Sequence, residues 1–423
     1  MGQQNDLPAI EGGKPIREKF LIFGRPQITQ DDIESVVDTM RSGWIGTGPK
    51  TAIFEDKIAK YVNAEYAVAL NSCTAGLHLA LLACGIKPKD EVITSSMTFA
   101  ATANVIEHVG AKPIFVDAEK DSMNIDPVAI HKHITKNTKA IIPVHMAGRP
   151  CDMDEIHKIA SLYKLAVIED AAHAFGAKYK GRPIGSLSDI TVFSFYVTKN
   201  LTTGEGGMVT TNNKKLTDFI RINSLHGLNK GAWKRYTSAG FKNYLVEAAG
   251  YKYNMTDMQA AIGLTQLERF ENNQKRRKQI WDKYTNAFAD LPLILPSPIL
   301  SSITHAFHLY TILVDLDRVR VNKDFIQTAL GAENIGVGTH FIALHLHPYY
   351  RNKYGFKRGD YPNAEFISDR TISLPLSADM TDFDVESVIK ATRKIFLFYT
   401  AHDSKHREAR GVKLNEILPS RKH

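Results

Sequence analysis

Residues 190–211 decide the fold, and they read ITVFSFYVTKNLTTGEGGMVTT. Two β-rich runs, Ile190–Tyr196 and Gly207–Thr211, flank a loop of Gly and Thr residues, which is the pattern of two strands joined by irregular chain. Lys199 lies in that loop, just after the first run. Composition alone makes a lysine a solvated surface charge. Apolar surroundings disfavour the ammonium form, so we expect this amine to have a lowered pKa and to be a candidate nucleophile toward an aldehyde.

Outward from this stretch, short strand-like runs alternate with longer amphipathic patterns from about residue 66. The strand-like runs are Tyr66–Leu70, Glu91–Thr94, Lys112–Asp117, Lys139–His145, Ala166–Ala172, Ile190–Tyr196 and Gly207–Thr211. The helical patterns between them are Thr74–Cys84, Thr98–Val109, Pro127–Ile134 and Cys151–Tyr163. This alternation predicts an α/β fold in which helices cover both faces of a mostly parallel, seven-stranded sheet.

The second half of the chain has a different pattern. Helical stretches at Lys214–Ile222, Thr256–Glu271 and Asn272–Asp290 are followed by the proline-rich Leu291–Ile299. Strand-like and helical segments then mix, at His308–Val314, Lys323–Leu330, Ile372–Leu376 and Asp382–Phe398. We therefore predict an N-terminal arm (1–24), an α/β domain (25–275), a smaller C-terminal α+β domain (276–400) and a basic tail (401–423).

Composition excludes several classes of protein. The chain has 423 residues, 43% of them hydrophobic and 23% charged, as in ordinary soluble proteins. Its net charge of +8 is spread widely rather than gathered in a stripe, so no nucleic-acid partner is expected. The three cysteines form no C-x-x-C pair, and no apolar run approaches the roughly 18 residues of a membrane span. A cytoplasmic protein without membrane contact is expected.

A carboxylate accompanies the lysine. Asp170 lies at the end of the apolar run Ala166–Ala172, and the carboxyl ends of parallel strands meet at one edge of a sheet. Asp170 and Lys199 are thus expected to share a crevice. An amine and an acid presented together suggest pyridoxal 5'-phosphate, which a lysine carries as a Schiff base while an aspartate pairs with the pyridinium nitrogen. The alternative for Asp170 is a helix N-cap.

Two further segments are candidates for binding this cofactor. The segment Asn71–Gly76, with Cys73 and Thr74, joins a strand to a helix, where free N–H groups favour a phosphate, although such residues also cap helices without a ligand. Ser194 is a second candidate phosphate donor. Phe99 follows another strand and could stack on a planar ring, whereas burial in the core is the commoner role of an aromatic side chain.

The segment Thr339–Tyr350 is rich in histidine. His340, His345 and His347 raise the possibility of a metal site, but no carboxylate or thiolate accompanies them at the spacing of helical ligands. A polar and aromatic wall that binds a sugar is the preferred interpretation. His340 and Tyr349 are its predicted substrate-binding residues.

An ordered succession of motifs resembles the DegT/StrS family of sugar aminotransferases, which are fold-type I pyridoxal phosphate enzymes. The motifs are Gly43–Pro49, Asn71–His78, Glu169–Ala174, Thr198–Asn200, Gly204–Gly207 and Gly250–Asp257. The resemblance assigns a cofactor role to each of seven residues. They are Lys199 as the Schiff-base lysine, Asp170 on the pyridine nitrogen, Phe99 stacked on the ring, His173 beside it, Thr74 and Ser194 on the phosphate, and Asn254 on the phosphate of the neighbouring subunit. A homodimer with shared active sites is implied.

The resemblance also implies the reaction. L-glutamate would give its amino group to the cofactor, with Lys199 moving the proton, and a nucleotide-linked keto sugar would then receive it. His173 resembles members that act at C4 of a hexose. The opening Glu11–Pro15 instead resembles members that act on 3-keto sugars and cyclitols.

Two other classes are weighed against an aminotransferase. A related sugar dehydratase would replace the lysine, commonly with His, and some of these enzymes need cysteines for an iron–sulfur cluster. A cofactor-binding regulator would need an output module, and none is evident in the sequence. An amino transfer at C4 of a nucleotide-linked 4-keto-6-deoxyhexose is therefore the predicted activity.

Overall fold

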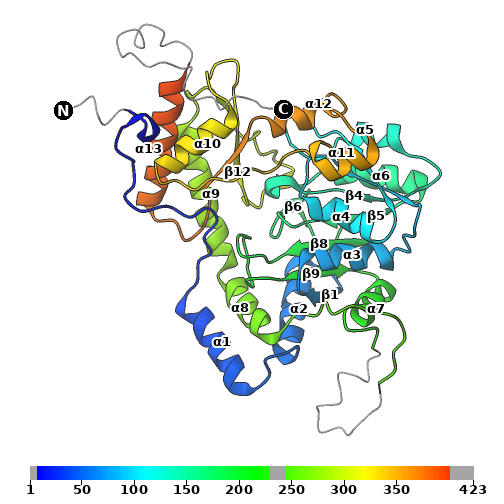
Figure 1. Ribbon diagram of the computed structural model, residues 1–423. Coiled ribbons are helices and arrows are strands. Elements are labelled where there is room, and N and C mark those ends of the chain that lie inside the picture. Colours follow the sequence, from blue (N-terminus) through cyan, green and yellow to red (C-terminus); the bar gives the residue numbers. More distant parts are fainter. Residues whose placement is uncertain (1–6, 229–243, 401–423) are drawn as a thin grey trace.

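The computed structural model describes residues 7–228 and 244–400. At its centre lies a seven-stranded sheet in the order β1-β9-β8-β5-β4-β2-β3 (Figure 1). The strands are β1 (Tyr66–Leu70), β2 (Glu91–Ser95), β3 (Lys112–Val116), β4 (Thr138–Ile142), β5 (Ala166–Asp170), β8 (Ile190–Ser194) and β9 (Gly207–Thr211). Strand β9 runs antiparallel to β1 and β8, and the other pairs are parallel. The predicted mostly parallel, seven-stranded sheet is confirmed.

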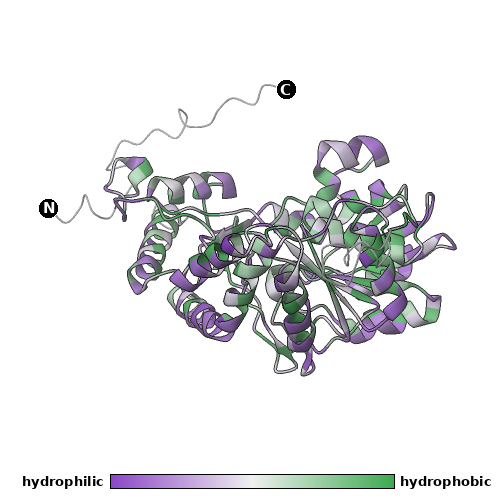
Figure 2. Cartoon of the chain, turned by 90° about the horizontal axis from the view of Figure 1, so that it is seen from below, coloured by the Kyte–Doolittle hydropathy of each residue, from purple (hydrophilic) through white to green (hydrophobic). Residues whose placement is uncertain are grey.

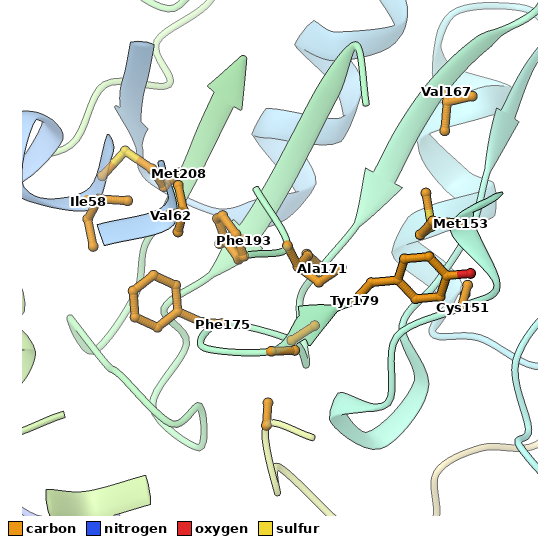
Figure 3. Packing of buried hydrophobic residues seen from close by; sticks show 14 of the residues in the cluster. Ile58, Val62, Cys151, Met153, Val167, Ala171, Phe175, Tyr179, Phe193 and Met208 are labelled. Carbon is orange, nitrogen blue, oxygen red and sulfur yellow. The ribbon is translucent and has the colours of Figure 1, made fainter. Parts of the chain in front are cut away.

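Helices cover both faces of this sheet. One apolar layer packs the sheet against α3 (Cys73–Ala83), α4 (Ala100–His108) and α7 (Lys214–Asn223). The other packs it against α2 (Pro49–Val62), α5 (Pro127–His133), α6 (Met153–Tyr163) and α8 (Asp257–Glu268). Successive residues of a strand point to opposite faces, so Val167 and Ile168 enter different layers. Figure 3 shows part of the second layer, with Ile58 and Val62 of α2 near Phe193 and Met208 of the sheet.

The predicted strands extend two or more residues past the observed ends at three places. The runs Lys139–His145, Ala166–Ala172 and Ile190–Tyr196 continue beyond β4, β5 and β8. Val144, Ala171 and Phe195 are nevertheless buried, because the chain turns inside the protein after each strand. An apolar pattern reports burial and does not mark where the strand pairing stops.

A second core lies in the C-terminal part of the chain. It is built by α9 (Phe270–Ala287), α10 (Lys323–Ala332) and α13 (Asp382–Tyr399) around the antiparallel sheet of β10 (Leu293–Ile294), β12 (Tyr310–Val314) and β13 (Thr371–Leu374). Helix α9 joins the cores, since Phe270 packs into the first and Trp281 into the second. The division at residues 275 and 276 falls inside this helix and stays a prediction.

The N-terminal arm is bound to the C-terminal part. The N–H groups of Ala9 and Ile16 donate to Glu333 at 2.7 and 2.8 Å, and Lys394 pairs with Glu333 at 2.9 Å. From there the arm descends to α1 (Gln30–Ser42), which packs against α8 (Figure 1). The predicted basic tail, 401–423, lies outside the described residues.

The remaining elements are short. They are the helices η1 (Ala9–Glu11), η2 (Met146–Gly148), η4 (Leu344–Leu346), α11 (Pro348–Tyr354) and α12 (Pro362–Ser368) and the strands β6 (Lys178–Tyr179), β7 (Arg182–Pro183) and β11 (Ile303–Thr304). Figure 2 shows that the surface helices turn polar residues outward and apolar residues toward the interior. Within the described ranges, no helix combines the length and the apolar character that crossing a bilayer requires.

Candidate active site

A cavity of about 340 Å³ opens at the carboxyl edge of the sheet. Eight of the ten predicted site residues line it, namely Cys73, Thr74, Phe99, Asp170, His173, Ser194, Lys199 and His340. The pairing of β9 with both neighbours explains this gathering, because Gly207 is the register partner of Leu70 and of Ser194. The ends of β1 and β8 thereby lie on either side of one residue.

Lys199 stands on the loop that leaves β8. Its backbone N–H donates to Tyr196 at 2.9 Å, which fixes the turn, while its amine forms no hydrogen bond with a described residue. Part of the side chain opens to the cavity. Burial lowers the pKa of Lys199 to about 8, and the nearby Asp170 carboxylate partly opposes this effect. A larger fraction of the amine than in an exposed lysine is therefore neutral, and nucleophilic, near neutral pH.

Asp170 ends β5 and is almost completely buried. Thr102 of α4 donates to Oδ2 at 2.8 Å, and the N–H of Ala172 donates to Oδ1 at 3.1 Å. Burial raises the pKa of Asp170, and these two hydrogen bonds oppose the rise. The described residues provide no ion pair for this carboxylate, so a positive group in the cavity would find a fixed partner.

The N-terminus of α3 forms another wall. Ser72 caps the helix by accepting from Ala75 N at 3.1 Å, and Cys73 and Thr74 follow in the first turn, where backbone N–H groups have no helical partner. A Cβ on Gly207 would lie 2.4 Å from the carbonyl carbon of Ser72, so only glycine lets β9 approach this turn. Such a helix start is suited to a phosphate group.

Imidazole and aromatic rings enclose the opposite side. The ring of His173 lies 4.5 Å from that of His308 and 5.9 Å from that of Phe341, centroid to centroid. Phe99 lies 5.9 Å from Phe341 and is 61% exposed. Burial lowers the pKa of His340 to about 4 and that of His173 and His308 well below the usual range. These imidazoles are thus neutral at physiological pH.

Two predicted residues lie elsewhere. Asn254 donates through Nδ2 to Thr47 Oγ1 at 2.6 Å, beside the end of β1, and does not line the cavity. Tyr349 is an exposed residue of α11 whose hydroxyl accepts from Lys353 at 3.2 Å. Within one chain, neither residue reaches the cavity, and their roles stay predictions.

The histidines of the Thr339–Tyr350 segment diverge. His340 Nδ1 lies 2.9 Å from Ser373 Oγ, whereas His345 Nε2 lies 3.1 Å from Glu365 and His347 Nε2 lies 3.3 Å from the carbonyl of Ile342. The described part of the chain holds no group of three or more His, Cys, Asp or Glu residues that could bind a metal ion.

Sequence reasoning missed Thr102, His308 and Phe341. Thr102 falls inside a predicted helix, and His308 begins a predicted strand, so neither looked different from a core residue. Phe341 is next to His340, and this proximity was the available signal. The structure adds all three to the cavity wall.

Comparisons with known proteins agree with this geometry. Residues 26–393 match the model of the DegT/DnrJ/EryC1/StrS aminotransferase family. SpsC of Bacillus subtilis, a spore coat polysaccharide biosynthesis protein, is 50% identical over 380 residues, which cover 90% of this chain and 98% of SpsC.

Solved structures give the same result. Spr1654 of Streptococcus pneumoniae, assigned as a sugar aminotransferase and solved in PMP and PLP forms, is 35% identical. In its PMP form it superposes with a TM-score of 0.84 and covers 90% of this chain and 100% of its own. DesI, solved in the presence of its TDP-sugar product, has a TM-score of 0.82 and 31% identity, and the match covers 95% and 99% of the two chains. Because the family model matches most of this chain, the chain belongs to the DegT/DnrJ/EryC1/StrS aminotransferase family.

Proposed function

We propose that this aminotransferase works in the cytoplasm and moves an amino group from L-glutamate to C4 of a nucleotide-linked 4-keto-6-deoxyhexose, with pyridoxal 5'-phosphate as its cofactor. The product would enter deoxyamino sugar or surface glycan biosynthesis. One observation carries the proposal: a lysine amine and a buried carboxylate without an ion pair in the described chain face a single cavity.

The residues present fit this cofactor. Asp170 is a fixed carboxylate for a protonated ring nitrogen, and the first turn of α3 offers free N–H groups for a phosphate. Cys73 and Thr74 belong to that turn, and Ser194 lies with them on the cavity wall. The PLP form of Spr1654 supports the same assignment.

The chain's own groups then perform the proton transfer. Lys199, as a neutral amine, takes the α-proton from the donor amino acid and later returns it as an ammonium ion. Asp170 would pair with the protonated ring nitrogen of the cofactor, and Thr102 holds the carboxylate in place. The cofactor supplies, when bound, an electron-withdrawing ring that takes up the electron pair left by the α-proton.

The identity of His173, which resembles that of members acting at C4, supports amination at C4. His173 lines the cavity, as expected for a residue that distinguishes acceptors. The segment Glu11–Pro15, whose sequence favours a 3-keto sugar or a cyclitol, instead lies at the C-terminal core, where Lys394 donates to Lys14 O at 2.8 Å and Tyr399 to Glu11 at 2.6 Å. The TDP-sugar of DesI and the polysaccharide role of SpsC support a nucleotide-linked sugar as acceptor.

An acceptor screen tests the proposal. The purified enzyme would be supplied with L-glutamate and, in parallel, with nucleotide-linked 4-keto and 3-keto sugars and a cyclitol ketone, and 2-oxoglutarate would be measured. We expect turnover with the 4-keto sugar and at most slow turnover with the others. Turnover with a 3-keto substrate alone would contradict C4 amination, and release of ammonia without transfer would contradict the aminotransferase mechanism.

We also propose a homodimer with shared active sites. Apolar side chains remain exposed in the single chain, both at the cavity (Phe99) and on two loops elsewhere (Trp44 and Ile45, Leu245 and Val246). Exposed apolar side chains that lie together are typical of interfaces. Asn254, which lies away from its own cavity, would contact the phosphate bound by the other subunit.

Subunit mixing tests the shared site. Lys199→Ala and Asn254→Ala subunits should each form inactive homodimers, but one of the two sites in a mixed dimer contains both native residues. Random mixing should thus restore about a quarter of wild-type activity, because half of the dimers are mixed. Mixing Lys199→Ala with Asp170→Asn is the matched control, since these two residues come from one subunit and no native site can form. Equal recovery in both mixtures, or none in the first, would rule out the shared site.

A further inference from the structure

His308 is a buried imidazole that the proposed reaction does not yet use. It lies between β11 and β12, is 4% exposed and forms part of the cavity wall. Its backbone is held at both ends, because its N–H donates to Ala147 O at 3.1 Å and its carbonyl accepts from the Arg277 guanidinium at 3.4 Å. The ring therefore has a fixed position next to His173.

The hydrogen bonds of Asn200 fix the tautomer of this ring. Asn200 Nδ2 donates to the backbone carbonyl of Ala306 at 2.5 Å and to Gln274 Oε1 at 3.1 Å. A backbone carbonyl can only accept, so the amide nitrogen must face it and Oδ1 must face His308 Nδ1, which is 3.0 Å away. Oδ1 can also only accept. His308 consequently carries its proton on Nδ1, and Nε2 presents a lone pair.

Two complementary hydrogen-bonding groups of the described chain then face the same cavity without a bonded partner. His308 Nε2 is an acceptor, the Lys199 amine is a donor, and neither forms a hydrogen bond within the described ranges. The two groups are linked through Asn200. This residue directly follows Lys199 in the chain, and its side chain orients the His308 imidazole. An ammonium ion has three N–H groups that need hydrogen-bond acceptors. In a site of low polarity, a neutral acceptor therefore stabilises the ammonium form.

We propose that His308 Nε2 accepts a hydrogen bond from the ammonium form of Lys199 after the lysine has taken up its proton. His308 is then a positioning residue that holds the amine between proton removal and proton return. The proton stays on Lys199 and no covalent bond changes. This inference rests on the proposed proton-transfer role of Lys199.

Other groups also face Lys199, but His308 is distinguished from them by a fixed tautomer that leaves Nε2 as an acceptor. Asp170 is engaged by Thr102 and Ala172 and is assigned to the cofactor nitrogen. His173 and His340 are neutral imidazoles as well, because burial lowers the pKa of each, but no hydrogen bond within the described residues fixes which of their ring nitrogens carries the proton, as Asn200 does for His308. Burial raises the pKa of the Cys73 thiol, which keeps it protonated. Burial likewise keeps His308 itself neutral.

A pair of substitutions separates the two ring nitrogens. The amide nitrogen of an asparagine occupies the place of Nδ1, so His308→Asn keeps the bond to Asn200 and loses the acceptor at Nε2. His308→Gln places its amide at Nε2 and keeps an acceptor there, but loses the bond to Asn200. We expect His308→Asn to slow the glutamate half-reaction by about 10- to 100-fold in kcat with little change in KM, and His308→Gln to retain more of the rate.

A second readout does not depend on turnover. In the enzyme loaded with the amine form of the cofactor, Lys199 is free, and its pKa can be measured from the pH dependence of its reaction with an amine-specific reagent. His308→Asn should lower that pKa by about one unit, because the ammonium loses an acceptor, whereas His308→Gln should lower it less.

Several outcomes would overturn the inference. A His308→Asn enzyme with the wild-type rate and Lys199 pKa, combined with a damaged His308→Gln enzyme, would show that the imidazole only anchors its loop. Should both variants fail to fold, ¹⁵N NMR of the wild-type enzyme still decides, since a proton found on Nε2 instead of Nδ1 contradicts the proposal. If borohydride fixed the cofactor to a different lysine in the wild-type enzyme, that result would contradict the proposed function itself, whatever the His308 variants show.

Discussion

Replacing Lys199 by Ala is expected to lower the rate of amino transfer by about 10⁴-fold, because one amine both takes and returns the proton and no other primary amine lines the cavity within the described residues. Stopped-flow absorbance of the glutamate half-reaction measures this loss. The Asp170 carboxylate and the helix start at Ser72 are untouched by the change, so the cofactor should still bind, although without a covalent bond.

Borohydride reduction and rescue by a small amine check the assignment. In the wild-type enzyme, reduction should fix the cofactor to the peptide that contains Lys199, and in Lys199→Ala it should fix none. Added methylamine should restore part of the rate, since it can occupy the space of the missing side chain and move a proton. A label on another peptide, or a variant that turns over at the wild-type rate, would contradict the proposed role.

Replacing Asp170 by Asn should cost about 10²- to 10³-fold in kcat. The substitution keeps the size of the side chain but removes the negative charge that would hold a proton on the cofactor nitrogen. Without that proton, the ring withdraws electrons less strongly when the α-proton leaves. Steady-state kinetics with saturating cofactor, together with cofactor affinity from absorbance titration, would separate lost chemistry from lost binding.

Thr102→Val is the matched control for this change. It removes the hydroxyl that donates to Asp170 Oδ2 at 2.8 Å and keeps the carboxylate itself. We expect a loss of about tenfold, smaller than that of Asp170→Asn, because the charge remains and only its orientation relaxes. An Asp170→Asn enzyme within a few-fold of wild type would show that the carboxylate does not act on the cofactor.

Much of the fold could be predicted because its signals are local. All seven strands of the main sheet were located from runs of β-branched and apolar residues, and most helices between them from the 3.6-residue period. Helices α1 and α2 were missed, although both carry start signals: a Thr29 and Asp32 capping box for α1, and Pro49 in the first turn of α2. Some of their apolar residues, such as Ile33 and Ile53, are exposed, so the apolar positions in the sequence do not mark a single buried face.

Residues of the candidate site could be predicted where a charged side chain stands at the end of a strand. Asp170 and Lys199 each follow an apolar run, and in a parallel sheet such positions meet at one edge whatever the rest of the chain does. Asn254 and Tyr349 were assigned without such a rule. Their positions depend on how loops pack, and Tyr349 lies on α11 with its side chain exposed.

The sequence by itself thus determined the sheet, most of its helices and the placement of the lysine and the carboxylate at one edge, because each follows from local periodicity and from the shared edge of parallel strands. Only the tertiary structure decided the environment that tunes these groups. Thr102 reaches Asp170 across 68 positions of sequence, and Asn200 reaches His308 across 108. No local pattern encodes such contacts, since they arise only when elements far apart in the sequence pack against one another.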